Sequence, residues 1–143
     1  MTTMTAPVTY RIPFNRPTRT PNDERYIAEA LASGILRGNG QFTRRCQSQM
    51  ERLLGVPRAL LTTSCTDALE MAALLVDIRE GDEVIVPAFT FVSSVNAFVL
   101  RGARPVFCDV RRDTLSMDHE ALDRLITPRT KCIVVVDHDV DVQ

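Results

Sequence analysis

The sequence predicts an α/β fold in which helices cover a mainly parallel sheet. Between residues 59 and 110, segments with helical spacing of apolar residues alternate with short apolar segments of strand length. A later run, 132–136, is apolar at every position, which is typical of a strand in the middle of a parallel sheet. We therefore expect strands at 59–62, 83–86, 104–108 and 132–136, with no hairpin between the second and third.

Helices are expected before, between and after these strands, at 21–33, 41–54, 66–77, 91–100 and 118–126. Thr20 and Pro21 form a helix start, with a capping hydroxyl followed by proline in the first turn. Gly55 ends the second helix. The third helix is apolar almost all round, which suits burial between the sheet and another layer or a partner subunit.

Length and composition favour one globular domain, since the chain has 143 residues and 45% hydrophobic content. We expect an extended arm at 1–19, the domain at 20–136 and a divergent tail at 137–143. A net charge of −1 gives no electrostatic reason to expect nucleic acid or an anionic membrane as partner. The first residues lack the features of a signal peptide, and no apolar run approaches the roughly 20 residues of a membrane span. We therefore expect a cytoplasmic protein whose four cysteines are reduced.

The turn Thr63-Ser64-Cys65-Thr66 lies between an expected strand and the start of the next helix. The first N–H groups of a helix have no internal partner and carry partial positive charge. Ser64, Cys65 and Thr66 are therefore candidates for binding a phosphate group, with hydroxyls adding hydrogen bonds. The alternative is that Ser64 or Thr66 serves only as a helix cap.

Two other polar clusters have similar alternatives. Arg44 and Arg45 could reach an anion, or could form the solvated face of their helix. The acidic end of the chain, with His138 among three aspartates, could suggest a metal site. We expect an acidic tail there and no metal, since chain ends are usually poorly ordered.

Three runs, 63–75, 81–87 and 90–97, resemble the DegT/DnrJ/EryC1/StrS family of sugar aminotransferases, and the resemblance extends from about Ile12 to Val136. It implies the amino-terminal portion of the large domain of an aspartate-aminotransferase-type (fold type I) enzyme, with pyridoxal 5'-phosphate as cofactor. It also implies that Phe91 stacks on the cofactor's pyridine ring, just past the carboxyl end of a strand. From the residues alone, Phe91 could equally belong to the core.

The resemblance further implies transfer of an amino group from L-glutamate to a dTDP-4-keto-6-deoxyhexose, in a homodimer that shares its active sites. The resemblance stops near residue 137, as a stop or frame shift near codon 137 of a longer gene would produce. In the family, the Schiff-base lysine follows this point. The only lysine here, Lys131, is expected at the amino end of the last strand, whereas the site lies at the carboxyl ends. We therefore expect no catalytic residue in this chain, no transamination by it alone, and at most weak non-covalent cofactor binding.

Two alternatives remain at this point. The chain could be a non-catalytic module that binds phosphate ligands, or one that dimerises with a full-length relative. It could also be a small nucleotide-binding α/β domain unrelated to transamination, although the density of family motifs argues against this. Whether the chain is part of an aminotransferase or a non-catalytic module, we expect its exposed apolar surface and open sheet edge to promote association.

Overall fold

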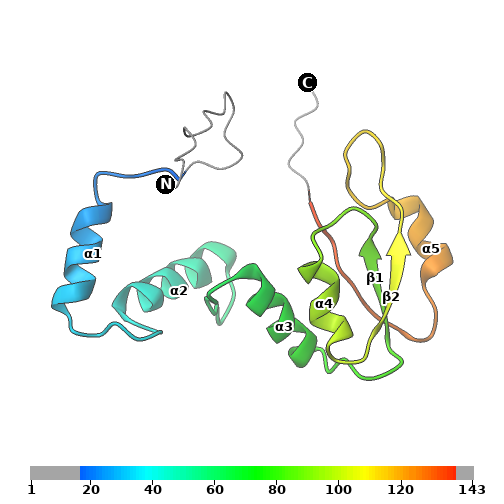
Figure 1. Cartoon of the computed structure of the whole chain (residues 1–143), viewed down its shortest axis with the longest axis horizontal. Coiled ribbons are helices and arrows are strands. Elements are labelled where there is room, and N and C mark those ends of the chain that lie inside the picture. The colour runs from blue at the N-terminus through cyan, green and yellow to red at the C-terminus, as the bar shows by residue number, and fades with distance from the viewer. Residues whose placement is uncertain (1–16, 138–143) are drawn as a thin grey trace, which may run out of the picture. The chain divides into compact units, whose positions relative to one another are not determined.

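The structure is a computed structural model that describes residues 17–137. Most of the expected arm and nearly all of the expected tail therefore lie outside the described residues. The chain divides into two compact units, Met1–Ala59 and Leu60–Gln143. We describe each by itself (Figure 1).

In the described part of the first unit, residues 17–59, there are two helices, α1 (Asp23–Ala32) and α2 (Gln41–Leu54). α2 has the predicted bounds, and α1 lies within the predicted 21–33. The ring of Tyr26 in α1 meets the ring of Phe42 in α2 edge to face, with centroids 5.3 Å apart. Neither helix contains a buried residue, so contacts of this kind between partly exposed side chains hold the pair together.

The second unit is a three-stranded sheet with helices on both faces. Along the chain it contains α3 (Cys65–Leu75), β1 (Glu83–Pro87), α4 (Ser93–Val99), β2 (Arg104–Cys108), the 3-10 helix η1 (His119–Ala121), α5 (Leu122–Leu125) and β3 (Thr130–Ile133). The strand order is β2-β1-β3, and both pairings are parallel. The predicted parallel sheet without a hairpin between its second and third strands is therefore confirmed.

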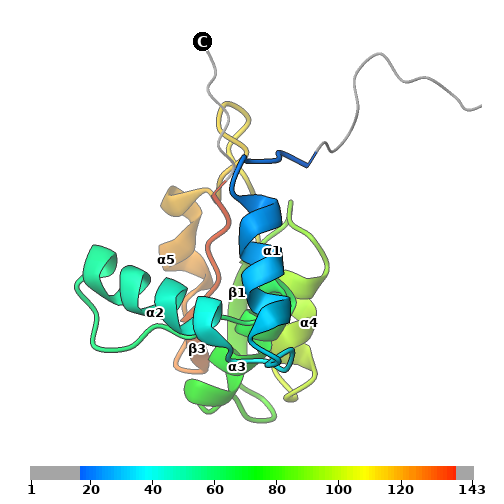
Figure 2. The same cartoon turned by 90° about the vertical axis from the view of Figure 1, so that its left-hand side faces the viewer.

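The core lies on both faces of β1, which is buried at all five positions. Val84 and Val86 pack on one face, with Ala73 of α3 and Phe98 of α4. Ile85 points to the other face, where its cluster comprises Cys108, Met117 and partly buried residues of η1 and α5. Figures 1 and 2 show β1 between α4 on one side and α5 on the other. The alternation of side chains along one strand thus builds two separate apolar layers.

The predicted strand at 59–62 is wrong, because these residues form no strand in the structure. A strand forms only where a neighbouring backbone accepts its hydrogen bonds. β1 already has β2 on one side and β3 on the other. Within residues 17–137, no backbone hydrogen bond joins 59–62 to the sheet.

Of the other elements, two differ most from their predicted bounds. The last strand was placed at 132–136, but β3 begins two residues earlier and ends at Ile133. The N–H of Val134 still donates to the carbonyl of Ile85 at 2.8 Å, and the chain then leaves the sheet. The helix predicted at 118–126 is only a 3-10 turn followed by one turn of α-helix, because Ile126 adopts an extended conformation shortly before Pro128.

Among the helices in the described range, none is long and apolar enough to span a bilayer. Nor do residues 17–137 bring together three His, Cys, Asp or Glu side chains that could hold a metal ion.

Candidate functional site

The start of α3 is capped by Ser64. This residue has extended backbone angles, φ −151° and ψ 163°, and its Oγ accepts a hydrogen bond of 3.1 Å from the N–H of Asp67. The Thr63 hydroxyl donates in turn to the Asp67 carboxylate. The cap interpretation of Ser64 is therefore correct, and it accounts for one of the free donors of the helix end.

Capping leaves other donors available at the same place. In the part of the chain that the structure describes, the N–H groups of Cys65 and Thr66 have no hydrogen-bond partner. The Ser64 hydroxyl accepts from the N–H of Asp67 and also bonds to the Asp67 carboxylate, so the hydroxyl beside these amides without such a bond is that of Thr66. Cys65 is exposed and Thr66 is half-buried. This combination of two amides, the Thr66 hydroxyl and a helix end suits an oxyanion such as phosphate.

The sequence analysis did not single out Asp67, although its spacing from Ser64 is that of a capping box. Its hydrogen bond from Thr63, with a second from Ser64, holds the carboxyl pKa below its ordinary value of 3.8. The carboxylate is therefore ionised at neutral pH. Asp67 stabilises the first turn of α3 and places one fixed negative charge beside the available amides.

Phe91 follows the carboxyl end of β1 and precedes α4. It exposes 75% of its surface, so the alternative that it belongs to the core is wrong. The loop around it is fixed on its other side, because the Thr90 hydroxyl donates to Oγ of the buried Ser94 at 2.9 Å. The carbonyl of Phe91 also accepts a bond of 3.0 Å from the N–H of Ser94. A held backbone thus presents an exposed aromatic ring.

The starts of α3 and α4 lie at one edge of the second unit. Figure 1 shows both helices beginning on the side toward which the arrows of β1 and β2 point, and running back from it. The two helices pack against each other. The first turn of α3 and the loop that leads into α4 therefore both lie at the carboxyl edge of the sheet, where α/β proteins bind their ligands.

Lys131 lies at the opposite edge, as predicted. It is the second residue of β3 and is exposed. Thr130, the residue before it, is in register with Glu83 at the amino end of β1, whereas the site begins beyond Pro87. Four strand residues at about 3.3 Å each separate these two ends, roughly 13 Å along the strand.

A parallel sheet with anion donors and an exposed ring at its carboxyl edge is an arrangement that suits a phosphorylated aromatic ligand. The family model described as the DegT/DnrJ/EryC1/StrS aminotransferase family matches residues 17–139. The chain belongs to the DegT/DnrJ/EryC1/StrS aminotransferase family, as its motifs predicted.

Individual relatives agree with this assignment. The chain is 34% identical over 125 residues to a GDP-perosamine synthase of Vibrio cholerae, covering 87% of this chain and 34% of the relative. It superposes on the putative sugar aminotransferase Spr1654 of Streptococcus pneumoniae, in its PMP-form, with TM-score 0.80 and 33% identity, over 88% of this chain and 32% of that one. An aminotransferase of Psychrobacter cryohalolentis gives TM-score 0.77 and 32% identity, over 86% and 32%. The chain thus spans about a third of the length of the relatives it matches.

These comparisons confirm the predicted fold type I architecture and pyridoxal phosphate as the cofactor of the family. The residues at the carboxyl edge fit this group in two respects. The start of α3 offers neutral donors of the kind that bind a phosphate, and Phe91 offers a flat apolar face for a heteroaromatic ring.

Proposed function

We propose that this chain supplies the part of a pyridoxal-phosphate-dependent sugar-nucleotide aminotransferase that holds the cofactor. The phosphate would be bound at Ser64, Cys65 and Thr66, and the ring would lie against Phe91. The supporting observation is that the two unpartnered amides of α3 and the exposed ring of Phe91 occur at the same edge of one sheet.

Each residue has a distinct role in this proposal. The N–H groups of Cys65 and Thr66 and the hydroxyl of Thr66 bind and orient the phosphate. Phe91 excludes water from one face of the ring and limits its tilt. When bound, pyridoxal phosphate supplies an electron sink for amino-group transfer.

The proposed substrates are L-glutamate as amino donor and a dTDP-4-keto-6-deoxyhexose as acceptor, used by a cytoplasmic homodimer. Two segments, 38–46 and 96–103, resemble the dTDP-4-amino-4,6-dideoxygalactose transaminase of enterobacterial common antigen synthesis. The Vibrio cholerae relative is named for a GDP-sugar, so the nucleotide is the feature to test. Binding of dTDP-sugar in preference to GDP-sugar supports this substrate, and the opposite preference contradicts it.

Lys131 is too far along its strand to reach this site, so we propose that the 143-residue chain by itself binds the cofactor without a covalent bond and does not transaminate. Arginine cannot replace the lysine, because its guanidinium stays protonated and is not nucleophilic. The test is to incubate the chain with pyridoxal phosphate, reduce with borohydride and map adducts by mass spectrometry. Stoichiometric labelling of Lys131 together with glutamate-dependent amination of a 4-keto sugar nucleotide would overturn the proposal.

The phosphate position has its own test by amide NMR. Pyridoxal phosphate and inorganic phosphate should both shift the signals of residues 64–66 first. Phe91→Ala should weaken binding of pyridoxal phosphate but leave inorganic phosphate unchanged. Leu100→Ala is the matched control, since Leu100 is 74% exposed but lies at the far end of α4. Shifts centred on Arg111 and Arg112 would show that the phosphate binds elsewhere.

A second candidate function is a non-catalytic module that pairs with a full-length relative. It is supported by the apolar surface of α3, where Leu74 and Leu75 expose 55% and 78% of their surface, and by Val135 beside β3 at 71%. Sedimentation at tens of micromolar, an order-of-magnitude concentration for such association, should show oligomers. Co-expression with a full-length relative should give a mixed complex, and a sharp monomer in both experiments would exclude pairing.

A further inference from the structure

The ring of Phe91 is not fixed by packing. Phe91 is largely exposed, and neither core cluster of the described residues includes it. An aromatic ring with few packing contacts takes its direction from the backbone of its own residue, because the side-chain rotamers are defined relative to that backbone. The direction in which this ring faces a ligand therefore depends on what holds the loop between β1 and α4.

One buried residue, Ser94, holds this loop at two points. Its N–H donates to the carbonyl of Phe91 at 3.0 Å, and its Oγ accepts from the hydroxyl of Thr90 at 2.9 Å. Ser94 is buried and Thr90 is half-buried, so water competes little for the bond between the two hydroxyls. Ser94 thus fixes both the carbonyl of Phe91 and the residue that precedes it.

Both ends of the loop are attached to the ordered sheet unit. Ser94 belongs to α4, and Ala97 and Phe98 of the same helix lie in the core cluster that contains residues of β1. At the other end, the N–H of Ala88 donates to the carbonyl of Cys108 in β2 at 2.7 Å. The contacts of Ser94 therefore transmit the position of the core to the loop that carries the exposed ring.

The alternative is that the hydroxyl pair only caps the start of α4. A side-chain cap accepts a hydrogen bond from a backbone N–H of the first helical turn. The Thr90 hydroxyl instead donates to another side chain, and the start of α4 has no side-chain cap bond. The bond between Thr90 and Ser94 therefore fixes the loop and does not serve the helix end.

We propose that Thr90 and Ser94 are positioning residues, whose shared hydrogen bond sets the angle at which Phe91 meets the heteroaromatic ring of the cofactor. This inference rests on the proposed function, since it needs a ligand ring at Phe91. The attraction between two aromatic rings depends on their offset and tilt. A loop that must be ordered when the ligand binds lowers the affinity, and the hydroxyl pair orders this loop in advance.

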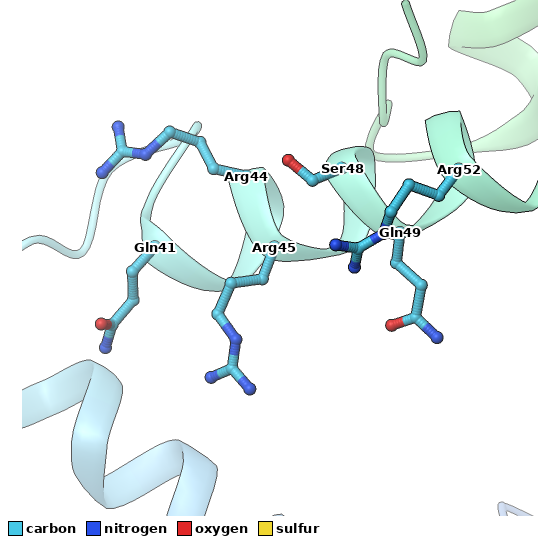
Figure 3. Close-up of a pocket in the computed structure, with 6 residues that line it drawn as sticks. All are labelled: Gln41, Arg44, Arg45, Ser48, Gln49 and Arg52. Carbon is cyan, nitrogen blue, oxygen red and sulfur yellow. The ribbon is translucent and has the colours of Figure 1, made fainter.

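The test titrates the full chain with pyridoxamine 5'-phosphate, which has no aldehyde and cannot form a Schiff base, and with inorganic phosphate. Thr90→Val removes the hydroxyl but keeps the shape of the side chain. It should weaken pyridoxamine phosphate binding by about threefold to fivefold, leave phosphate binding unchanged, and alter the circular dichroism induced in the bound pyridine ring. Anions are also attracted by Arg44, Arg45 and Arg52, which line a hollow along α2 (Figure 3), so dissociation constants are taken from the amide signals of residues 64–66.

Three further variants separate positioning from a general loss of stability. Thr90→Ser keeps the hydroxyl and should retain most of the affinity for pyridoxamine phosphate. Ser94→Ala should repeat the effect of Thr90→Val, and the double variant should be no weaker than either, because both changes break one bond. The matched control is Thr114→Val, which removes another half-buried threonine hydroxyl, one that accepts from the N–H of Ser116 at 3.3 Å in the loop after β2. It should leave both affinities unchanged.

The outcomes distinguish this inference from the proposed function. Equal losses for the two ligands in Thr90→Val, or the same loss in Thr114→Val, would show that the hydroxyl pair only stabilises the fold. If Phe91→Ala weakens pyridoxamine phosphate binding and Thr90→Val does not, the positioning role is wrong and the proposed function stands. If neither ligand shifts residues 64–66 of the unaltered chain, both are wrong.

Discussion

The helix pair and the sheet unit achieve order in different ways. Every buried residue found in the described part of the chain belongs to the sheet unit, from Ala73 to Val134, whereas α1 and α2 have none. The sheet unit joins strands far apart in sequence, and the helix pair joins neighbours through rings and guanidinium groups. The stability of the first should therefore depend on packing, and that of the second on local contacts with partly exposed side chains.

The largest effect is expected at the centre of the sheet. Ile85 is fully buried between neighbouring strands, so Ile85→Ala should lower the free energy of unfolding of the sheet unit by about 3 kcal/mol. Urea denaturation followed by circular dichroism measures this. Leu75→Ala is the control, because Leu75 is 78% exposed and its truncation should cost within about 0.5 kcal/mol. Equal costs at the two positions would mean that the sheet core is not packed as described.

A smaller loss of stability is expected at Gly102, which lies close to the backbone of Glu80. Gly102 has a φ of +88°, and a Cβ added there would lie 3.0 Å from the Cα of Glu80. Gly102→Ala should therefore cost about 2 kcal/mol, from the strained φ and the contact together. Gly81 also has a φ of +88° but has open space around it, so Gly81→Ala isolates the cost of φ alone. If Gly81→Ala were the more damaging change, the close approach of Gly102 to Glu80 would be wrong.

In the helix pair, truncation of a side chain should cost less stability than in the sheet unit. Phe42→Ala removes the edge-to-face contact with Tyr26 and the surface under Arg45, which should cost about 1 kcal/mol locally. Amide hydrogen exchange reads this as faster exchange in α1 and α2 with no change in β1. Equal acceleration in β1 would show that the two units unfold together.

The last prediction concerns pH. Glu83 accepts hydrogen bonds from the Thr127 hydroxyl at 2.6 Å and from Arg129 at 2.7 and 3.1 Å, and these lower the pKa of its carboxyl. The folded state therefore keeps this group ionised where the unfolded state binds a proton. Its contribution is complete above the ordinary value of 4.5 and is lost as pH falls through the folded pKa.

Glu83→Gln should accordingly flatten the dependence of stability on pH below 4.5, as measured by urea midpoints from pH 6 down to pH 3. The flattening should be partial, because Asp23, Asp67, Asp77 and Asp113 also have lowered pKa values. An unchanged slope would show that the carboxyl of Glu83 titrates alike in both states.

Sequence patterns predicted best where one element determines its own structure. β1 and β2 were expected within a residue of their bounds, because each is a short apolar run between turn residues, and Gly55 ended α2 where predicted. The prediction of a strand at 59–62 was wrong because apolar residues suggest burial but do not show which neighbouring strand would accept the backbone hydrogen bonds. Leu60 and Leu61 are in fact exposed.

The candidate site shows the same limit. Ser64 was recognisable as a cap from its spacing to α3, and a Ser-x-x-Asp search would also have found Asp67. Exposure of Phe91 could not be read from the chain, because helical spacing allowed it to be core. The exposure of Phe91 follows from the conformation of its loop, which a hydrogen bond between the hydroxyls of Thr90 and Ser94 holds. A pattern of apolar residues contains no information on such a bond.

The contacts of Glu83 also bear on the order in which the protein can fold during synthesis. Its partners Thr127 and Arg129 follow it by 44 and 46 residues, whereas β2 begins about 20 residues after it. A growing chain can thus pair β1 with β2 well before Arg129 exists. Since domains fold as the chain emerges, at about 5–20 residues per second, the interval lasts for seconds. Throughout it the Glu83 carboxylate at the amino edge of the nascent sheet has Arg104 of β2 nearby but lacks its hydrogen-bond partners Thr127 and Arg129, which arrive just before β3.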